Sequence, residues 1–484
     1  RMAAEQTIRK LSPKKIGSEK IAIIFEDSEL TYSDLTKKSL SLADILKTDS
    51  PKVISLLLPN GIDFVVSYFG ILASGNICHI IPPSISDSNL IHQLKLTDPS
   101  LIISNKILQK KLLRTNILKN YKFLDIESFH FEDSINFHPV GEPSSIAMIL
   151  FSAGTTSTPK AVQLSHNNVE NTVNRVNNFL SITENDIDVI SLPLSHSFGL
   201  GCLNCIIKSG GTAVLHKNTI NLPKVISSIK DYNATSFAST PTTFQQIMAN
   251  HKLQFRNSID SIRYLLTNSS PMPNELTNNL LDILENKNLY TYYGLTEASR
   301  STFHLYKKQD DKINSVGKPL PGVTIKIIRN SNECTALEHG EICIQGNHVS
   351  QGYWKTIGNN QKFENNWLHT GDIGYFDKDG YLFLVGRKDD LINIGGEKVF
   401  PKEIEDILKL MEKIDDVAVK GITDALLGQV VKAFIVTKNG VHLKDDEIYS
   451  FCKGKLENYK IPRIIKFLDK LPKNDQGKLL RKKL

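Results

Sequence analysis

The sequence predicts an α/β protein with doubly wound parallel sheets and a smaller C-terminal domain. Between residues 52 and 284, short β-rich runs alternate with amphipathic segments, the pattern of parallel strands covered by helices on both faces. After about Lys312, short strands separated by Gly, Asn and Asp turns indicate an antiparallel β subdomain. From Pro401, a helix with one apolar face and two further strands indicate a third unit. A chain of 484 residues is also too long for one compact core.

Between residues 52 and 284, the expected strands and helices alternate along the chain. Strands are expected at Val53–Leu58, Ile77–Ile81, Ile146–Phe151, Val189–Leu192, Thr212–Leu215, Ala234–Ala238 and Ile262–Leu266. Helices are expected at Ile62–Ala73, Asn89–Leu96, Asn168–Phe179, Leu200–Lys208, Val225–Asp231 and Thr243–Asn250. Such sheets bind ligands beyond the carboxyl ends of their strands, so a site is expected in the loops that follow them.

The later elements set the expected domain boundary. Short strands are expected at Val323–Ile328, Glu341–Gln345 and Tyr381–Val385, and two more at Val417–Lys420 and Val430–Val436. Pro401 occupies a probable first helical position, a place where its missing N–H costs nothing. We therefore expect an N-terminal domain at residues 1–388, with its antiparallel β subdomain at about 312–386, and a C-terminal domain at 389–484.

Composition and charge exclude several classes of protein. Hydrophobic residues make up 40% and charged residues 23% of the chain, unlike a disordered or disulfide-scaffold protein. The most apolar stretch, residues 64–85, is interrupted by Gly and Pro and lacks the ~20 uninterrupted apolar residues of a membrane span. Six widely spaced cysteines favour reduced thiols and a cytoplasmic location. Cys202 and Cys205 form a lone CxxC, which is either a metal or redox pair or one face of an apolar helix.

The basic excess is confined to the C-terminal end. The formal net charge is +7, from 58 Lys and Arg against 51 Asp and Glu. Residues 451–484 hold 11 basic and 3 acidic residues, a net of +8. This segment has few aromatic residues and no nucleic-acid motif, so we expect no nucleic-acid partner.

A small, hydroxyl-rich loop follows the apolar run Ile146–Leu150. It reads FSAGTTSTPK at residues 151–160. Glycine lets the backbone approach a ligand, Ser and Thr donate hydrogen bonds, and Lys160 supplies positive charge, so the loop is suited to phosphate oxygens. It is not a Walker A loop, which has Gly immediately before the Lys. The alternative is a flexible polar surface loop.

The loop and eight further motifs, in order, resemble the adenylate-forming superfamily of acyl-CoA synthetases, adenylation domains and luciferases. The resemblance covers nearly the whole chain from about Thr31. The further motifs are LPLSHSFGL (192–200), YYGLTE (292–297), SVGKPLPG (315–322), WLHTGD (367–372), GRKDD (386–390), GGE (395–397), PKEIE (401–405) and LPKNDQGK (471–478).

The resemblance implies a fold and a reaction. The N-terminal domain would contain two doubly wound sheets and a small β-barrel-like subdomain, followed by a small mobile α+β lid. The enzyme would use ATP and Mg²⁺ to convert a carboxylic acid to acyl-AMP with release of pyrophosphate, and then transfer the acyl group to CoA. Charge accumulates on phosphate oxygens in such a step, so cations and aimed donors do most of the catalysis.

The resemblance also assigns roles to individual residues. The catalytic residues would be Lys160, His196, Thr296, Glu297 and Lys478, with Glu297 holding Mg²⁺. ATP would be bound by Ser152, Gly154, Thr155, Thr156, Ser157, Tyr293, Asp372 and Arg387. The acyl pocket would be lined by His196, Phe198, Asn268, Ser269, Ser270 and Gly294, the thiol tunnel by Gly395 and Gly396, and the hinge would be Asp389. Lys478, in the basic lid, would act during adenylation only.

Each assignment has a structural alternative. Thr296 and Glu297 after a Gly are also typical of a helix start. Tyr293 would otherwise be a core tyrosine, Asp372 a turn residue beside Gly371, and His196 a satisfied structural histidine. Lys478 would otherwise be a solvated lysine in a frayed tail.

Departures from the family pattern bear on the substrate. Residues 195–200 contain no acidic residue to pair an α-amine, and a buried unpaired ammonium costs several kcal/mol, on the order of other unpaired buried charges. We therefore expect a fatty, aryl or similar acid and not an amino acid. Residues 267–271, Thr-Asn-Ser-Ser-Pro, stand where the family usually has a Gly-Gly-Ala-Pro-like turn. Their side chains predict a shorter, aromatic or polar acyl group.

Two questions stay open at this level. CoA and the phosphopantetheine arm of an acyl carrier protein share their thiol end, so a carrier protein is the alternative acceptor. A non-catalytic nucleotide-binding scaffold is the distant alternative to an enzyme. The sequence names neither the acid nor the oligomeric state.

Overall fold

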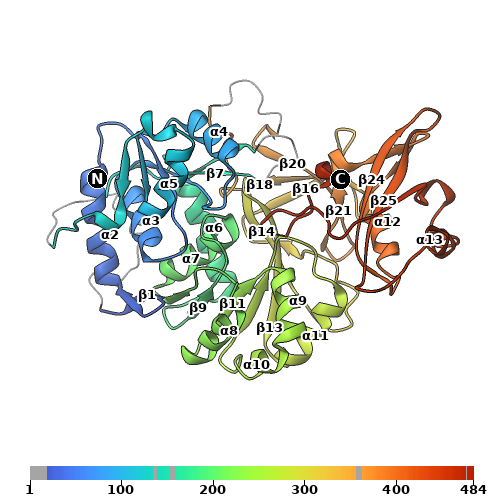
Figure 1. The fold of residues 1–484 in the computed structure, drawn as a ribbon, viewed down its shortest axis with the longest axis horizontal. Helices are drawn as coiled ribbons and strands as arrows, with labels where there is room; N and C mark the ends of the chain where they lie inside the picture. Colours follow the sequence, from blue (N-terminus) through green and yellow to red (C-terminus); the bar gives the residue numbers. More distant parts are fainter. Residues whose placement is uncertain (1–18, 134–138, 153–158, 356–361, 476) are drawn as a thin grey trace. The chain divides into compact units, whose positions relative to one another are not determined.

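The computed structural model describes residues 19–133, 139–152, 159–355, 362–475 and 477–484. These residues form two compact units (Figure 1). The first contains the described residues up to Thr324 together with Gln345–Leu368, and the second contains Ile325–Ile344 and His369–Leu484. The division falls inside the predicted antiparallel subdomain. The boundary predicted at residue 388 concerns a moving lid, and it stays a prediction.

A nine-stranded sheet forms the centre of the first unit. Its strands are β1 (Ile21–Phe25), β2 (Ser28–Thr31), β9 (Ile187–Ile190), β10 (Thr212–Leu215), β11 (Ser236–Ser239), β12 (Tyr264–Thr267), β13 (Asn288–Leu295), β14 (Ala298–Leu305) and β15 (Lys318–Pro319), in the order β15-β14-β13-β12-β11-β9-β10-β1-β2. The six strands from β13 to β1 in this order are parallel. Antiparallel hairpins close both ends.

Helices cover both faces of this sheet, as the alternation predicts. One face packs on α8 (Leu222–Asp231), α9 (Pro241–Asn250), α10 (Lys252–Arg256) and α11 (Asn274–Leu284) through a buried apolar cluster that includes Val189, Phe237 and Phe244 (Figure 1). The buried faces of α6 (His166–Leu180) and α7 (Ser197–Ser209) belong to the same unit. The alternation therefore arises because strands buried on both faces need a helix on each side.

A second, six-stranded sheet follows the same rule. Its order is β6 (Phe123–Asp125), β5 (Leu101–Ser104), β3 (Val53–Leu56), β4 (Ile77–Ile80), β7 (Ile146–Phe151) and β8 (Ala161–Ser165). All neighbours are parallel except β8, which pairs antiparallel with β7. Its helices are α2 (Tyr32–Leu46), α3 (Ile62–Ala73), α4 (Asp87–Thr97) and α5 (Lys106–Arg114).

The later part of the chain contains two smaller sheets. The first has the order β17 (Asn332–Glu333), β16 (Thr324–Arg329), β18 (Gly340–Gln345), β20 (Trp367–Phe376), β19 (Phe363–Glu364), and β21 (Leu382–Arg387) also pairs with β20. The second has the order β23 (Glu397–Val399), β22 (Ile392–Ile394), β25 (Gly428–Thr437), β24 (Ile414–Asp424), with β26 (Ile464–Phe467) parallel to β25. Helices α12 (Pro401–Leu408) and α13 (Asp445–Cys452) contribute Ile404, Leu408 and Ile448 to its core.

The α/β class and the alternation are confirmed, and a few predicted boundaries are wrong. The strand expected at Val189–Leu192 lies at Ile187–Ile190, because the Asn60 amide instead of a neighbouring strand binds the Leu192 carbonyl. The β1–β2 hairpin was not predicted at all. No helix in the described ranges is long and apolar enough to cross a membrane.

Candidate active site

The Thr296-Glu297 pair lies in a tight turn and not at a helix start. Leu295, the last residue of β13, pairs with Ala298, the first residue of β14, so the two residues connect the strands. Gly294 is required at this point, because a Cβ atom there would lie 2.5 Å from the backbone nitrogen of Arg300. The helix-start alternative is therefore wrong, and the hairpin fixes both side chains at the carboxyl end of a parallel strand.

Tyr353 connects two of the predicted catalytic residues. Its hydroxyl donates a hydrogen bond to Oε1 of Glu297 at 2.8 Å, and both side chains are buried. The Lys160 ammonium lies 5.1 Å from the centre of the Tyr353 ring. Three segments far apart in the sequence thus bring a cation and a carboxylate to one phenol. Sequence reasoning missed Tyr353, since no local pattern around it indicates a partner 56 positions away.

The Glu297 carboxylate fits the binding of Mg²⁺. The Tyr353 hydroxyl donates its hydrogen bond to one of the two Glu297 carboxylate oxygens, and carboxylate oxygens are the ligands that Mg²⁺ prefers. Among the described residues, no group of three or more His, Cys, Asp or Glu side chains could hold a metal ion. A single carboxylate combined with substrate phosphates is the usual way in which proteins hold this ion.

The base of the phosphate loop is closed by the backbone. The Ser152 N–H donates to the Lys160 carbonyl at 3.0 Å, where β7 and β8 diverge. Gly154, Thr155, Thr156 and Ser157 lie outside the described residues, so their predicted contacts with phosphate stay predictions. Lys160 and Ser152 are both partly exposed.

A buried asparagine braces the loop that carries His196. The Asn60 amide donates to the Leu192 carbonyl at 2.8 Å, and its oxygen accepts from the Leu194 N–H at 2.8 Å. His196 is the N-cap residue of α7, and its side chain is half-buried. Gly199 allows the turn to pack against the helix, because a Cβ there would lie 2.3 Å from the Pro193 carbonyl oxygen. Asn60 is a second residue that the sequence did not reveal.

Four of the predicted acyl-pocket residues lie at the carboxyl ends of two neighbouring parallel strands. Asn268, Ser269 and Ser270 follow β12, and β12 is the neighbour of β13, which carries Tyr293 and Gly294. Ser269 has φ of +93°, a left-handed conformation that side chains disfavour, so the serine occupies a backbone position suited to glycine. Phe198 is buried with its ring 5.6 Å from that of Tyr292. Tyr293 is 6% exposed, as a core tyrosine would be.

In the second unit, Asp372 and Arg387 form an ion pair. They face each other across β20 and β21, and Nη1 of Arg387 donates to Oδ1 of Asp372 at 2.6 Å. Gly371 adopts φ of +75°, and a Cβ there would lie 3.1 Å from the guanidinium. Glu341 accepts from the Gly371 N–H at 3.0 Å. The turn alternative for Asp372 and the ribose role both fit this geometry, and Glu341 is a supporting residue that the sequence analysis did not select.

The two glycines of the predicted thiol tunnel form a hairpin turn. Gly395 and Gly396 connect β22 and β23 with φ of +58° and +92°. A two-residue hairpin loop with both φ positive favours glycine for conformational reasons alone. The predicted hinge, Asp389, lies in a short 3-10 turn, Lys388–Asp390. Neither role is tested by this geometry.

The segment that carries Lys478 is folded and not frayed. Asn474 and Lys478 exchange two hydrogen bonds at 2.9 Å, and Leu480 donates its N–H to the Pro472 carbonyl at 2.8 Å. Arg481 then forms ion pairs with Glu405 and Asp390. The Lys478 side chain itself is exposed. The frayed-tail alternative is therefore wrong for the backbone of this segment.

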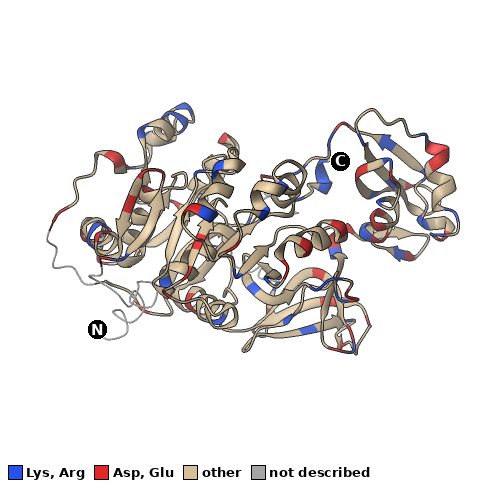
Figure 2. Cartoon of the chain, turned by 90° about the horizontal axis from the view of Figure 1, so that it is seen from below, with Lys and Arg blue, Asp and Glu red and all other residues tan. Residues whose placement is uncertain are grey.

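Three basic residues of the C-terminal segment form ion pairs within the second unit. Lys460 bonds Glu403, Lys473 bonds Asp416 and Arg481 bonds Glu405. Residues 389–450 of the same unit contain 8 basic and 13 acidic residues, a net of −5, which offsets part of the +8 of residues 451–484. Figure 2 shows acidic positions interspersed among the basic ones in this part of the chain. Lys460, Lys473 and Arg481 thus have structural partners, whereas the Lys478 side chain is exposed.

The CxxC pair lies on a buried helix face. Cys202 and Cys205 are both buried on α7 and are free thiols. Burial raises the pKa of both, that of Cys205 to about 12. A metal or redox pair needs thiolates, so the helix-face interpretation holds.

Comparisons with known proteins agree on one family. Residues 13–354 match the model of the AMP-binding enzymes, and residues 403–478 match that of the AMP-binding enzyme C-terminal domain. The 2-succinylbenzoate–CoA ligase of Bacillus licheniformis is 31% identical over 97% of this chain and 97% of its own length. The long-chain-fatty-acid–CoA ligase of Bacillus subtilis is 30% identical over 96% of this chain and 91% of its own length.

A solved structure extends the similarity to the fold. The o-succinylbenzoate CoA synthetase of Bacillus subtilis, in complex with its acyl-adenylate intermediate, superposes with a TM-score of 0.88 at 27% identity and covers 99% of this chain and 97% of its own. The same protein is also known in complex with ATP and magnesium ion, with a TM-score of 0.87 over 100% of this chain and 99% of its own.

Proposed function

The chain belongs to the AMP-binding enzyme family, and from this membership we propose how its own residues perform the reaction. The enzyme is an AMP-forming acid–thiol ligase that uses ATP, Mg²⁺ and CoA. In the first half-reaction a carboxylate oxygen attacks the α-phosphorus of ATP, and the bond from that phosphorus to pyrophosphate breaks. In the second, the CoA thiol releases its proton to solvent and its sulfur attacks the acyl carbonyl carbon; the C–S bond forms, the acyl C–O bond to the phosphate breaks, and AMP leaves.

The first unit would hold the phosphates. Lys160 supplies a cation and Thr296 a hydroxyl donor to the departing pyrophosphate, with the phosphate loop around them. Glu297 would hold Mg²⁺, which supplies charge neutralisation on the phosphate oxygens when it is bound. The contact series from Lys160 through Tyr353 to Glu297 carries this proposal, because it fixes a cation and a carboxylate in one place.

The second unit would hold the ribose and supply Lys478 for adenylation. Asp372 accepts from ribose hydroxyls, and Arg387 keeps that carboxylate in place through the 2.6 Å hydrogen bond. Lys478 would stabilise charge on the α-phosphate and the attacking carboxylate. In the thioester step, motion about Asp389 would replace Lys478 by a face that includes Gly395 and Gly396.

The acid is proposed to be an aryl, short or polar carboxylic acid. The side chains at Asn268–Ser270 occupy the edge of the acyl pocket, which limits the length of chain that fits. The relatives named above act, by their names, on an aryl acid and on long-chain fatty acids, so both classes belong in the assay. CoA is the proposed acceptor since these relatives are CoA ligases, and none of them favours a carrier protein.

Acid-dependent exchange of pyrophosphate into ATP tests the adenylation step directly. We expect exchange with at least one acid of a panel of aryl, C4–C10 and C16–C18 acids. Lys160→Met should reduce it roughly 100-fold or more, the usual loss for a group that stabilises transition-state charge, whereas Lys252→Met, on an exposed helix start, should not. Absence of exchange with every acid, in a protein that binds ATP, would leave the nucleotide-binding scaffold as the better function.

A further inference from the structure

His196 lies in a short segment, residues 192–198, that leads from β9 into the first turn of α7. Two buried polar side chains bond this segment, and both come from distant parts of the chain within the first unit. Asn60 is 7% exposed and Arg300 is 2% exposed. Water therefore does not compete for their hydrogen bonds, and each bond fixes the backbone more firmly than a surface contact would.

Asn60 bonds the part of the segment that precedes His196. Its amide nitrogen donates to the Leu192 carbonyl at 2.8 Å and to the His216 carbonyl at 3.0 Å, and its oxygen accepts from the Leu194 N–H at 2.8 Å. Asn60 follows β3 of the six-stranded sheet, whereas His216 follows β10 of the nine-stranded sheet. One amide group therefore ties the segment to both sheets of the first unit.

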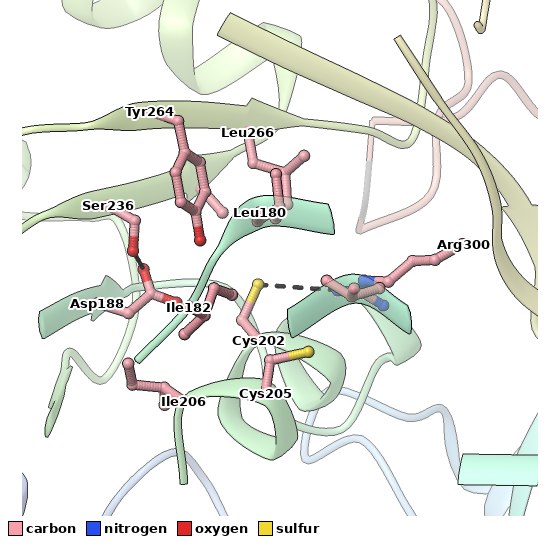
Figure 3. Close-up of a pocket in the computed structure, with 12 residues that line it drawn as sticks. Leu180, Ile182, Asp188, Cys202, Cys205, Ile206, Ser236, Tyr264, Leu266 and Arg300 are labelled. Carbon is pink, nitrogen blue, oxygen red and sulfur yellow. Dashed lines mark hydrogen bonds between the residues drawn. The ribbon is translucent and has the colours of Figure 1, made fainter. Parts of the chain in front are cut away.

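Arg300 bonds the part of the segment that follows His196. Its guanidinium donates to the Phe198 carbonyl at 3.0 Å and to the Ser197 carbonyl at 3.4 Å, both in the first turn of α7. It also donates to Sγ of Cys202, one turn further along the helix, at 3.8 Å (Figure 3). The backbone on the second side of His196 is thus held by a single buried cation.

Helix α7 is shaped around this guanidinium. A Cβ atom on Gly201 would clash with Nη1 of Arg300, so only glycine leaves room for it. Arg300 itself adopts φ of +51°, an uncommon backbone conformation for arginine. Its charge also lies beside the first turn of a helix, where the macrodipole disfavours a cation. These costs are offset by the hydrogen bonds that the guanidinium makes to α7.

The cavity beside Arg300 is too small for a substrate. It lies between the nine-stranded sheet and α7 and has room for about one water molecule (Figure 3). On its other wall, Asp188 accepts from Oγ of Ser236 at 2.9 Å. Arg300 therefore acts on the backbone of α7 and not on a molecule in this cavity.

Arg300 also connects His196 to the turn that carries Thr296 and Glu297. It lies three residues after Glu297 in the same hairpin, on β14. The hairpin is tight at this point, because a Cβ atom on Gly294 would clash with the backbone nitrogen of Arg300. The side chain thus joins the hairpin that is proposed to hold Mg²⁺ to the helix that begins after His196.

We propose that Asn60 and Arg300 are positioning residues, which together fix His196 beside the substrate acid before the acid binds. The proposal rests on the acid-activating function above and deepens it. His196 is the N-cap residue of α7, but its side chain makes no capping hydrogen bond. The bonds of Asn60 and Arg300 to the neighbouring backbone hold the residue instead. A reacting site gains most when its groups are oriented before the substrate arrives.

Hydrogen–deuterium exchange tests this hold without any substrate. In the wild type, a peptide spanning residues 192–200 should take up deuterium more slowly than the exposed loop at 307–311. Asn60→Ala and Arg300→Met should each speed uptake in the first peptide by roughly 10-fold. Uptake in the wild type as fast as in the exposed loop, or unchanged uptake in both variants, overturns the proposal. Asn60→Asp and Arg300→Lys, which keep part of the bonding, give the same readout if the larger changes prevent folding.

Two control variants match these changes in chemistry but bond other parts of the first unit. Arg263 donates to the Leu180 carbonyl at the end of α6, and Asn76 donates to the Leu46 carbonyl at the end of α2. Arg263→Met and Asn76→Ala should lower the melting temperature. They should leave both the deuterium uptake of the peptide around His196 and the KM for the acid unchanged.

Kinetics then show whether the hold on His196 serves the reaction. Asn60→Ala and Arg300→Met should lower kcat/KM for the acid in pyrophosphate exchange roughly 10- to 100-fold, and leave the KM for ATP within about twofold. In a His196→Ala background the same substitutions should have little further effect. Equal losses in both backgrounds, or equal changes in KM for the acid and for ATP, overturn the positioning role.

The two hypotheses fail in different ways. Absence of pyrophosphate exchange with every acid in the wild type contradicts the proposed function. The deuterium measurement needs no acid, so it still decides whether Asn60 and Arg300 hold the segment. Pyrophosphate exchange that occurs normally in both variants contradicts their positioning role alone.

Discussion

Tyr353→Phe removes a single oxygen atom and asks whether the phenol holds the Glu297 carboxylate in position. Tyr353 is 5% and Glu297 4% exposed, and the hydroxyl donates at 2.8 Å, so water does not replace the lost bond. Hydrogen bonds to charged groups contribute about 1.5–3 kcal/mol, equivalent to roughly 10- to 150-fold in rate. The aromatic ring and its contact with Lys160 remain, so the change isolates the hydroxyl.

The assay is acid-dependent pyrophosphate exchange at saturating ATP, repeated over a range of Mg²⁺ concentrations. We expect the maximal rate to fall roughly 10- to 150-fold and the Mg²⁺ midpoint to rise, because a carboxylate free to rotate binds the ion less well. Tyr121→Phe is the control, since its hydroxyl bonds the Leu94 carbonyl far along the chain from these residues.

A double-mutant cycle separates a positioning role from general destabilisation. If Tyr353 acts through Glu297, Tyr353→Phe should have little further effect in a Glu297→Gln background. An unchanged rate in the single variant would refute the reasoning. So would the same fold-loss in both backgrounds, because the hydroxyl would then act independently of the carboxylate.

Three further predictions concern Lys478, Arg481 and the buried carboxyl group of Asp188. Lys478→Ala should lower pyrophosphate exchange roughly 100-fold or more but leave thioester formation from added acyl-AMP nearly unchanged. Lys482→Ala is the control. Equal losses in both assays would contradict a role of Lys478 that is specific to adenylation. Arg481→Met breaks the ion pairs with Glu405 and Asp390, and it should lower the free energy of unfolding of the second unit, measured in urea, by about 1–3 kcal/mol. The same variant should also slow pyrophosphate exchange. A normal exchange rate would mean that Arg481 does not position Lys478. Burial raises the pKa of Asp188 to about 7 from its ordinary 3.8, so the folded protein binds a proton there more tightly than the unfolded chain does. The stability that this gives is fully present below about pH 4 and is lost as the pH rises through 7. The free energy of unfolding of Asp188→Asn, relative to that of the wild type, should therefore rise by up to about 4 kcal/mol between pH 4 and pH 8. A difference that does not depend on pH would contradict the raised pKa.

Local patterns predicted most of the helices and strands because burial imposes them locally. The helix at Ile62–Ala73 and the strands at Ile146–Phe151 and Thr212–Leu215 have the expected bounds. In each case an apolar run ends at Gly or a polar turn, so the sequence contains both the periodicity and the stop.

Residues whose role depends on partners far away in the sequence could not be identified from local patterns. Asn60 braces a loop more than 130 positions away, and Tyr353 meets Glu297 across 56. Neither has a neighbour in sequence that marks it. Arg300 was missed for the same reason, because its guanidinium is buried only once it packs against Gly201 of α7. The roles of such residues arise from tertiary contacts, and a single sequence shows the residues but not these contacts.

Three of the residues proposed to act on the substrate share one arrangement. Glu297 is held by Tyr353, Asp372 by Arg387, and the Lys478 loop by Arg481, and each supporting residue lies in the same unit as the group it supports. Catalytic groups gain most when they are oriented before the substrate arrives. If a domain movement exchanges Lys478 for a thiol path, supports confined to one unit let it proceed without dismantling the geometry of either set. Substitution of Tyr353 or Arg481 should therefore slow adenylation, in which Glu297 and Lys478 are proposed to act, more than it slows thioester formation. A support whose loss slows both half-reactions equally would act on the structure in general and not through the group it contacts.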